Sequence, residues 1–421
     1  MKPTKIVKPI FLAAITLAFA LGAGPAAAQS QDDEIAELRA QLLAMKTQME
    51  ALETRLEATE AKATEAESKA ETAEQTAVAV HQSIGAMPDA DGKNVAPIPM
   101  IEESWADRTT LGGYGEMHLT LGDKEEIDFH RWVLFLNHQY TDRIKFVSEL
   151  ELEHSLAGDG KPGEVELEQA YMEFDLGGDF WLKTGIYLLP VGFLNETHEP
   201  NTFYGTERNV IESEIIPSTW WEGGIAVTKK FDSGLSFDLG VHSGLDVPTD
   251  GDNAYRIRSG RQKVAEALAS DAAFTLRGQY NGIPGFNLGS SVQYQTDVSQ
   301  GSPENNPAWL AEAHVEWRMG NFQLRALGAS WFIDGPTVEA LGLDEQFGYY
   351  VEPSYRWSTD RGDFGFFGRY GHFDAEKGEF DYIETGLNYW PIDSLVFKLD
   401  YRRVTGDAEE DLYNFGVGYV F

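Results

Sequence analysis

The sequence predicts an all-β transmembrane barrel of about 16 antiparallel strands with an N-terminal α-helical coiled coil. Three observations predict this fold class. Segments that alternate apolar and polar residues recur from residue 107 onward, at a length suited to tilted membrane strands. A sustained 3-4 spacing of apolar residues occupies residues 35–80. A leader typical of exported proteins opens the chain.

Composition narrows the functional classes. The 421 residues include 17 Tyr, 24 Phe, 10 Trp and 42 Gly but no Cys, which excludes disulfide frameworks, thiolate metal sites and cysteine nucleophiles. The formal net charge of -35 argues against nucleic-acid binding, because phosphate contacts need clustered Lys and Arg. We expect no cofactor and no metal site, since His198-Glu199 lacks the second histidine of a metalloprotease helix.

Residues 1–28 read as a signal peptide. Three lysines within the first eight residues precede an apolar run over 10–21, and the alanines 26–28 provide an A-x-A cleavage site. An uncleaved membrane anchor is less favoured, because the apolar run is shorter than a bilayer span requires. The chain is therefore expected to be exported.

Residues 29–80 are predicted to form a periplasmic coiled coil, followed by a linker over 81–106. Apolar or small residues fill every a and d position from Ile35 to Val80 except Thr59, and one such helix needs partners to bury its stripe. A lone amphipathic helix on a membrane is the alternative, but the stripe is narrow and the polar face is more acidic than basic. Glycines, prolines and aspartates then mark the linker.

Residues 107–421 are predicted to form the barrel. Seven short turns, beginning with Thr141-Asp142, alternate with eight mostly longer polar connections, which gives sixteen strands. An even count places both ends of the barrel on one side, with short turns there and long loops on the other, as in outer-membrane barrels. The final strand, 411–421, alternates to its last residue, and we expect Phe421 to act as an assembly signal.

Alternation also predicts which side chains face the lumen. In residues 395–402, Leu395, Phe397, Leu399 and Tyr401 alternate with a more polar set. The charged set must face water, because Lys or Arg on the lipid side at mid-bilayer costs about 2–4 kcal/mol. The predicted pore-lining residues are Lys145, Glu149, Glu151, Arg277, Glu312, Glu316, Arg318, Arg325, Arg369, Lys398, Asp400 and Arg402.

Two stretches resemble a known family. TGLNYWP at 385–391 followed by FKLDY at 397–401 is similar to the penultimate hairpin of the phosphate-selective porins of the O and P type, and Ala170-Tyr171, Gly185, Pro190 and Glu207-Arg208 resemble their middle portion. The resemblance covers the barrel from about Leu111 to Phe421. It implies a trimeric sixteen-strand porin of the Gram-negative outer membrane, with the third outside loop folded into the lumen and the heptad segment as a periplasmic trimerisation extension.

The chain departs from the phosphate-selective members in its lumen. Those members carry rows of basic residues, and a Lys commonly follows the glycine that corresponds to Gly185, where this chain has Leu188. The predicted lumen mixes acids and bases. Phosphate selectivity therefore does not carry over from the resemblance.

The third outside loop, predicted over 191–222, is expected to be the constriction. Its predicted constriction residues are Glu196, His198, Glu199, Glu207, Arg208, Glu212 and Glu214. Such an excess of carboxylates would raise the local cation concentration and repel anions, giving a general or weakly cation-preferring pore. The alternative is that these acids are solvated loop residues or bind divalent ions at the surface.

The predicted function is passive diffusion of small hydrophilic solutes or ions through a homotrimer in outer-membrane lipid, without enzymatic activity. A barrel hydrolase is disfavoured, because the adjacent His154 and Ser155 would point to opposite faces of a strand. Two competing hypotheses stay open: a coiled-coil envelope tether with a poorly conducting barrel, and a phosphate- or anion-selective channel.

Overall fold

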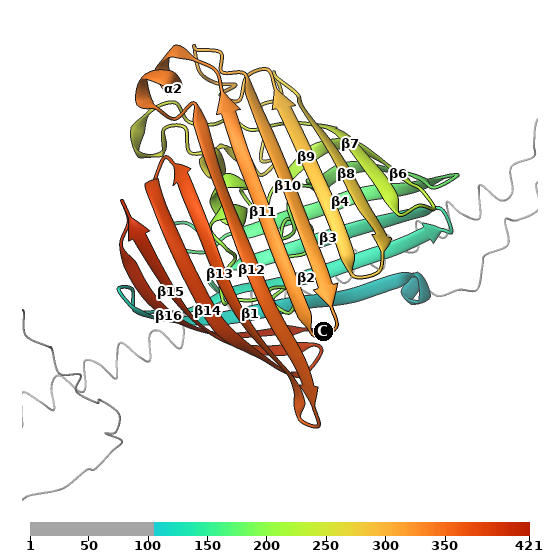
Figure 1. The fold of residues 1–421 in the computed structure, drawn as a ribbon. Coiled ribbons are helices and arrows are strands. Elements are labelled where there is room, and N and C mark those ends of the chain that lie inside the picture. Colours follow the sequence, from blue (N-terminus) through green and yellow to red (C-terminus); the bar gives the residue numbers. More distant parts are fainter. Residues whose placement is uncertain (1–104) are drawn as a thin grey trace, which may run out of the picture. The chain divides into compact units, whose positions relative to one another are not determined.

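The computed structural model of the chain describes residues 105–421. Within this part, sixteen antiparallel strands pair in sequence order, and β1 pairs with β16 to close a barrel (Figure 1). The predicted barrel and its strand count are therefore confirmed. The predicted signal peptide (1–28) and coiled coil (29–80), and nearly all of the linker (81–106), lie outside the described residues.

The strand bounds follow the predicted segments closely. The strands are β1 (Thr109–Gly122), β2 (Glu126–Thr141), β3 (Ile144–Glu153), β4 (Val165–Gly177), β5 (Phe180–Leu188), β6 (Trp221–Lys230), β7 (Leu235–His242), β8 (Ala273–Ile283), β9 (Phe286–Gln295), β10 (Ala308–Met319), β11 (Phe322–Ile333), β12 (Glu345–Thr359), β13 (Gly362–Ala375), β14 (Gly378–Ile392), β15 (Leu395–Gly406) and β16 (Glu410–Val420). A short 3-10 helix, Trp105–Arg108, precedes β1.

Connections at the two ends of the barrel differ in length, as predicted. At one end of the barrel, which we call the turn end, strands are joined by two to four residues. At the other end, which we call the loop end, most connections are longer. The connection from β13 to β14 is tighter than expected, because Gly378 adopts a φ of +90° and closes a two-residue turn. The sixth loop contains a helix that was not predicted, α2 (Pro336–Leu341), with Pro at its start and a left-handed Gly342 at its end.

The two faces of the sheet have opposite character. Along β10, Trp309 and Ala313 are exposed, whereas Leu310, Glu312 and His314 are buried. The outer face accordingly presents large apolar side chains on strand after strand, among them Phe274, Leu276, Leu288, Phe366, Ile383, Phe397, Leu399, Tyr413 and Phe415. Such a surface suits lipid contact. Among the described residues, no helix is long and apolar enough to cross a membrane.

The barrel closes where β16 meets β1. Phe421 and Gly113 exchange two backbone hydrogen bonds, of 3.0 and 2.9 Å. The Phe421 ring stacks on Trp132 with 6.5 Å between ring centroids, and a Cβ at position 113 would lie 2.8 Å from its Cζ. Glycine at 113 therefore leaves room for the aromatic ring beside the seam.

Candidate functional site

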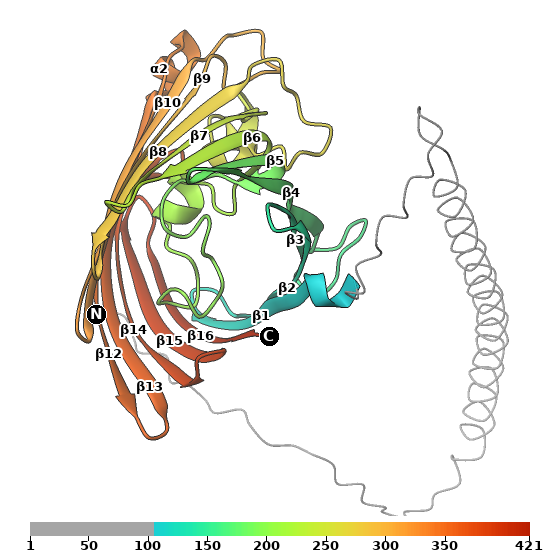
Figure 2. The same ribbon diagram turned by 90° about the vertical axis from the view of Figure 1, so that its right-hand side faces the viewer.

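The connection between β5 and β6, residues 189–220, lies inside the barrel. We call it the third loop; it is the segment predicted over 191–222. Figure 2 shows it in green within the ring of strands. Loops normally run over the surface, because buried backbone polar groups need partners. In the third loop, Leu189, Val191, Ile211, Ile216 and Trp220 are all fully buried.

Charged side chains from strands around the barrel hold the backbone of the third loop. Four inward cations donate to its carbonyl oxygens, among them Arg325 to Thr202 O at 3.3 Å, and one carboxylate accepts from an amide. The other contacts are Arg131 to His198 O (2.7 Å), Arg369 to Tyr204 O (2.9 Å), Lys398 to Gly205 O (2.8 Å) and Thr206 N–H to Asp400 (2.7 Å). The buried backbone of the loop thus finds the partners that solvent would otherwise supply.

The anchoring cations are themselves paired with wall carboxylates. Buried Arg369 lies 2.5 Å from oxygens of both Glu352 and Glu384. Arg131 pairs with Glu116 at 2.5 Å. A buried charge is tolerated only when it is paired and hydrogen-bonded, so wall and loop form one network whose members depend on each other.

An apolar cluster fixes the second half of the third loop against β11 and β12. Trp220 and Trp331 lie with ring centroids 6.1 Å apart, and Trp331 Nε1 donates to Ile215 O at 2.8 Å. Ile211 packs over Gly348, where a Cβ would come within 2.4 Å of its Cδ1. This interior packing leaves the lumen far from empty, in contrast to a simple water-filled tube.

Glu212 ties the two arms of the third loop together. Its carboxylate is fully buried and accepts from the amides of Phe193 (2.6 Å) and Leu194 (2.7 Å). It also accepts from Tyr350 Oη at 2.7 Å and Asn209 Nδ2 at 3.2 Å. One side chain thus satisfies four donors and sets the path of the loop.

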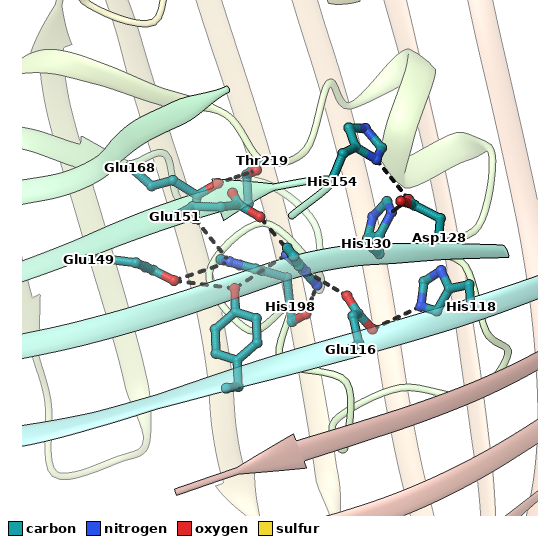
Figure 3. Close-up of polar contacts among 12 residues, drawn as sticks. Glu116, His118, Asp128, His130, Glu149, Glu151, His154, Glu168, His198 and Thr219 are labelled. Carbon is teal, nitrogen blue, oxygen red and sulfur yellow. Dashed lines mark hydrogen bonds and ion pairs between the residues drawn. The ribbon is translucent and has the colours of Figure 1, made fainter. Parts of the chain in front are cut away.

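His198 anchors the loop to the wall formed by β3 and β4. Its Nε2 lies 3.5 Å from a Glu149 oxygen and 3.4 Å from a Glu168 oxygen (Figure 3). Burial alone would lower the pKa of His198, but the Glu149 and Glu168 carboxylates beside its ring outweigh that effect and raise the pKa to about 10. The imidazole is therefore a cation at neutral pH.

Most carboxylates predicted to form the constriction have partners. Glu196 pairs with Arg277, and Glu207 Oε1 lies 2.6 Å from His118 Nδ1. Glu214 lies 3.0 Å from Arg256 and 2.6 Å from Lys377, and Glu212 is held inside the loop. Glu199 and Arg208 each have one buried polar atom without a hydrogen-bond partner. The acidic excess read from the sequence is thus largely compensated by cations from other segments.

The predicted pore-lining residues lie on the inner face, and six of them contact the third loop. These six are Glu149, Arg277, Arg325, Arg369, Lys398 and Asp400. The others pair with wall residues or one another: Lys145 with Glu173, Glu151 with Arg131, Glu312 with His314, Glu316 with Arg318 and Arg325, and Arg402 with Glu410.

Residues of the third loop border three cavities. A cavity of about 720 Å³ at the loop end is lined by Glu207 and Arg208, among others. Two further cavities lie at the turn end. One, of about 470 Å³, is lined in part by Glu196, and the other, of about 570 Å³, in part by Thr197 and by the four residues from Asn201 to Tyr204. The loop therefore lies between the space at one end of the barrel and the space at the other.

Sequence reasoning missed a group of histidines. His118, His130 and His154 surround Asp128 at the loop end of β1 to β3, although the sequence shows them only as scattered positions. The spacing of Asp128 and His130 on one strand was the only local signal. Their approach depends on irregular backbone that a period of two does not encode.

Comparison of the sequence with known proteins identifies a family and a relative. The family model described as phosphate-selective porin O and P matches residues 112–414. An uncharacterized protein of Aquifex aeolicus (strain VF5) is 26% identical over 349 residues, which cover 74% of this chain and 80% of that protein.

Solved structures share the barrel fold. The anion-selective porin from Comamonas acidovorans matches with a TM-score of 0.53 and 10% identity, over 74% of this chain and 99% of that one. The trimer form of OmpT, an outer membrane protein of Vibrio cholerae, matches with a TM-score of 0.50 and 11% identity over the same shares.

Proposed function

Because the chain belongs to the phosphate-selective porin O and P family and is thus an outer-membrane porin, we propose that it is a passive diffusion channel for small hydrophilic solutes or ions in which the third loop is the constriction. One observation carries the proposal: loop residues border the cavities at both ends of the barrel. A solute crossing the barrel would pass these side chains. The constriction residues that we propose are Glu196, Glu207, Arg208 and Glu214, which line these cavities, whereas His198, Glu199 and Glu212, predicted from the sequence as well, line none of the three.

We propose that the pore has little preference between cations and anions. The excess of loop carboxylates in the sequence predicts a general or weakly cation-preferring pore, but Glu196, Glu207 and Glu214 all have cationic or histidine partners. Pairing reduces the potential that a fixed charge projects into the lumen. A weakly anion-preferring pore is the second candidate, because basic residues outnumber acidic ones around both turn-end cavities.

Planar bilayer recordings of the purified protein test both parts. We expect discrete conductance steps and a reversal potential close to zero across a KCl gradient. A clear anion-type reversal potential would favour the second candidate, and a clear cation-type potential would mean that the paired carboxylates still dominate the field. If folded and inserted protein gave no conductance steps, the channel proposal itself would be refuted.

We also propose a homotrimer with the coiled coil over 29–80 in the periplasm. The trimer form of the similar Vibrio cholerae protein supports this assembly by analogy. The heptad spacing of residues 35–80 would supply a second association surface. Analytical ultracentrifugation in detergent measures the oligomer directly, and a monomer at micromolar concentration would refute the proposal.

A further inference from the structure

Three histidines and an aspartate gather at the loop end of the barrel. His118 comes from β1, Asp128 and His130 from β2, and His154 follows the last residue of β3. Figure 3 shows His130 and His154 both directed toward Asp128, with His118 nearby. His118 contacts the third loop through Glu207, but the contacts of Asp128 with His130 and His154 involve no loop residue, so loop anchoring does not explain those three side chains.

Two backbone irregularities create the cluster. The pairing of β1 and β2 shifts between Glu116 and His118, where a bulge inserts an extra residue on β2 and places His118 opposite Asp128. His154 has a φ of 50°, which breaks the alternation of β3, and its amide donates to His130 O at 3.0 Å. Bulges often sit next to functional sites, where they re-aim side chains.

The potential ligand atoms already lie close together. Asp128 Oδ2 is 2.7 Å from His154 Nδ1 and 3.4 Å from His130 Nδ1. One ligand atom from each of the three residues lies within 4.8 Å of the other two. Ligands in a tetrahedral zinc site with bonds of about 2.0–2.1 Å are about 3.3 Å apart, so small side-chain rotations suffice.

The ligand chemistry selects the class of ion. Two imidazoles and one carboxylate suit Zn²⁺, Ni²⁺, Cu²⁺ or Fe²⁺, whereas Ca²⁺ and Mg²⁺ prefer oxygen ligands only. His118 is a neighbour and not a ligand, because its two nitrogens already face Glu116 at 3.3 Å and Glu207 at 2.6 Å. Its ring stacks on His130 with centroids 4.7 Å apart and so restrains that ligand.

The site is also accessible. Asp128, His130 and His154 keep 20, 23 and 32% of their side-chain surface exposed. All three line the loop-end cavity of about 720 Å³ together with Glu207 and Arg208 of the third loop. An ion can therefore reach the three ligands from solution and retain water at its open coordination positions.

We propose that Asp128, His130 and His154 bind one divalent transition-metal ion, with Zn²⁺ as the reference case, in the loop-end cavity of the barrel. The bound cation adds positive charge beside Glu207 and Arg208, and it reduces the current through the pore. This electrical effect rests on the proposed channel function, whereas metal binding does not.

Isothermal titration of Zn²⁺ into full-length protein without a histidine tag tests the binding. Wild type should take up about one equivalent, and Asp128→Asn, His130→Ala and His154→Ala should each weaken binding by at least about tenfold. His372→Ala is the matched control. His372 on β13 resembles the ligands in that its Nδ1 lies 2.9 Å from Asp381 on β14, but no other histidine of the described residues joins this pair. That variant should bind like wild type.

Equal Zn²⁺ uptake by wild type and His130→Ala/His154→Ala would overturn the proposal, as would failure of wild type to bind. Heat-modifiable electrophoretic mobility shows whether each variant is folded. If a histidine variant does not fold, Asp128→Asn tests the same site with a smaller change. In bilayers, Zn²⁺ on the loop side should lower the current of wild type and not of the double variant. Protein that binds Zn²⁺ without conducting refutes only the channel, and protein that conducts without binding refutes only the metal site.

Discussion

At the scale of single residues, His198 makes loop anchoring pH-dependent. Its neighbours across the wall are Glu149 and Glu168, with Arg131, Tyr114 and Glu151 nearby. The pKa of His198 is raised from the usual value of about 6.5 to about 10, so its stabilising effect is complete below about pH 6.5 and is lost as the pH rises through 10.

We therefore predict that wild-type conductance rises, or becomes noisier, between about pH 7 and 10 as the loop loosens. His198→Gln removes the titrating group, so this variant should show the looser behaviour at every pH and a flatter profile. Single-channel recording over the pH range measures both. Identical profiles for wild type and variant would show that another group controls the loop.

Glu212 supports a second prediction at this scale. Glu212→Ala leaves four donors without this acceptor, three of them buried, and each buried donor without a partner costs about 1–3 kcal/mol. We expect a mobile third loop, seen as faster proteolysis within 189–220 and a larger, fluctuating conductance. Asp393→Ala is the control, because that side chain is fully exposed on a turn. Unchanged proteolysis of Glu212→Ala would contradict the role given to this carboxylate.

At the scale of elements, the β1–β16 seam depends on Phe421. Deleting Phe421 removes two backbone hydrogen bonds to Gly113 and the ring stacked on Trp132, whereas Phe421→Ala removes the ring alone. We predict slower or incomplete folding, worse for the deletion, with normal conductance in the molecules that insert. The folded fraction is read from heat-modifiable electrophoretic mobility. Wild-type folding of the deletion variant would show that the seam closes without this residue.

The strands could be predicted because their signal is local. In residues 395–402 apolar and polar side chains alternate, so each residue type indicates which face of the strand it occupies. Turn residues mark both ends of such segments, so the number of strands and the orientation of their faces can be predicted from the sequence alone. The path of the third loop could not be predicted in this way. Its contacts join distant residues, such as His118 with Glu207, and the bulge beside His118 and the left-handed His154 follow no sequence period.

At the scale of the whole molecule, the sixteen strands that close the barrel all lie between Thr109 and Val420. We predict that deletion of residues 29–80 leaves the conductance of each pore unchanged and shifts the oligomer toward smaller species on dilution. Bilayer recording and ultracentrifugation measure the two effects. Loss of conductance in this variant would make the N-terminal segment part of the channel and favour roles beyond diffusion.

The central claim is that solutes pass the third loop, and cysteine modification tests it most directly because the chain has no Cys of its own. Thr197 is exposed on the loop and lines a turn-end cavity, whereas Asp159 is exposed in the second outer loop. A cationic methanethiosulfonate reagent should reduce the current of Thr197→Cys in discrete steps and leave that of Asp159→Cys unchanged. Complete modification of Thr197→Cys, verified by mass spectrometry, with an unaltered current would contradict the claim.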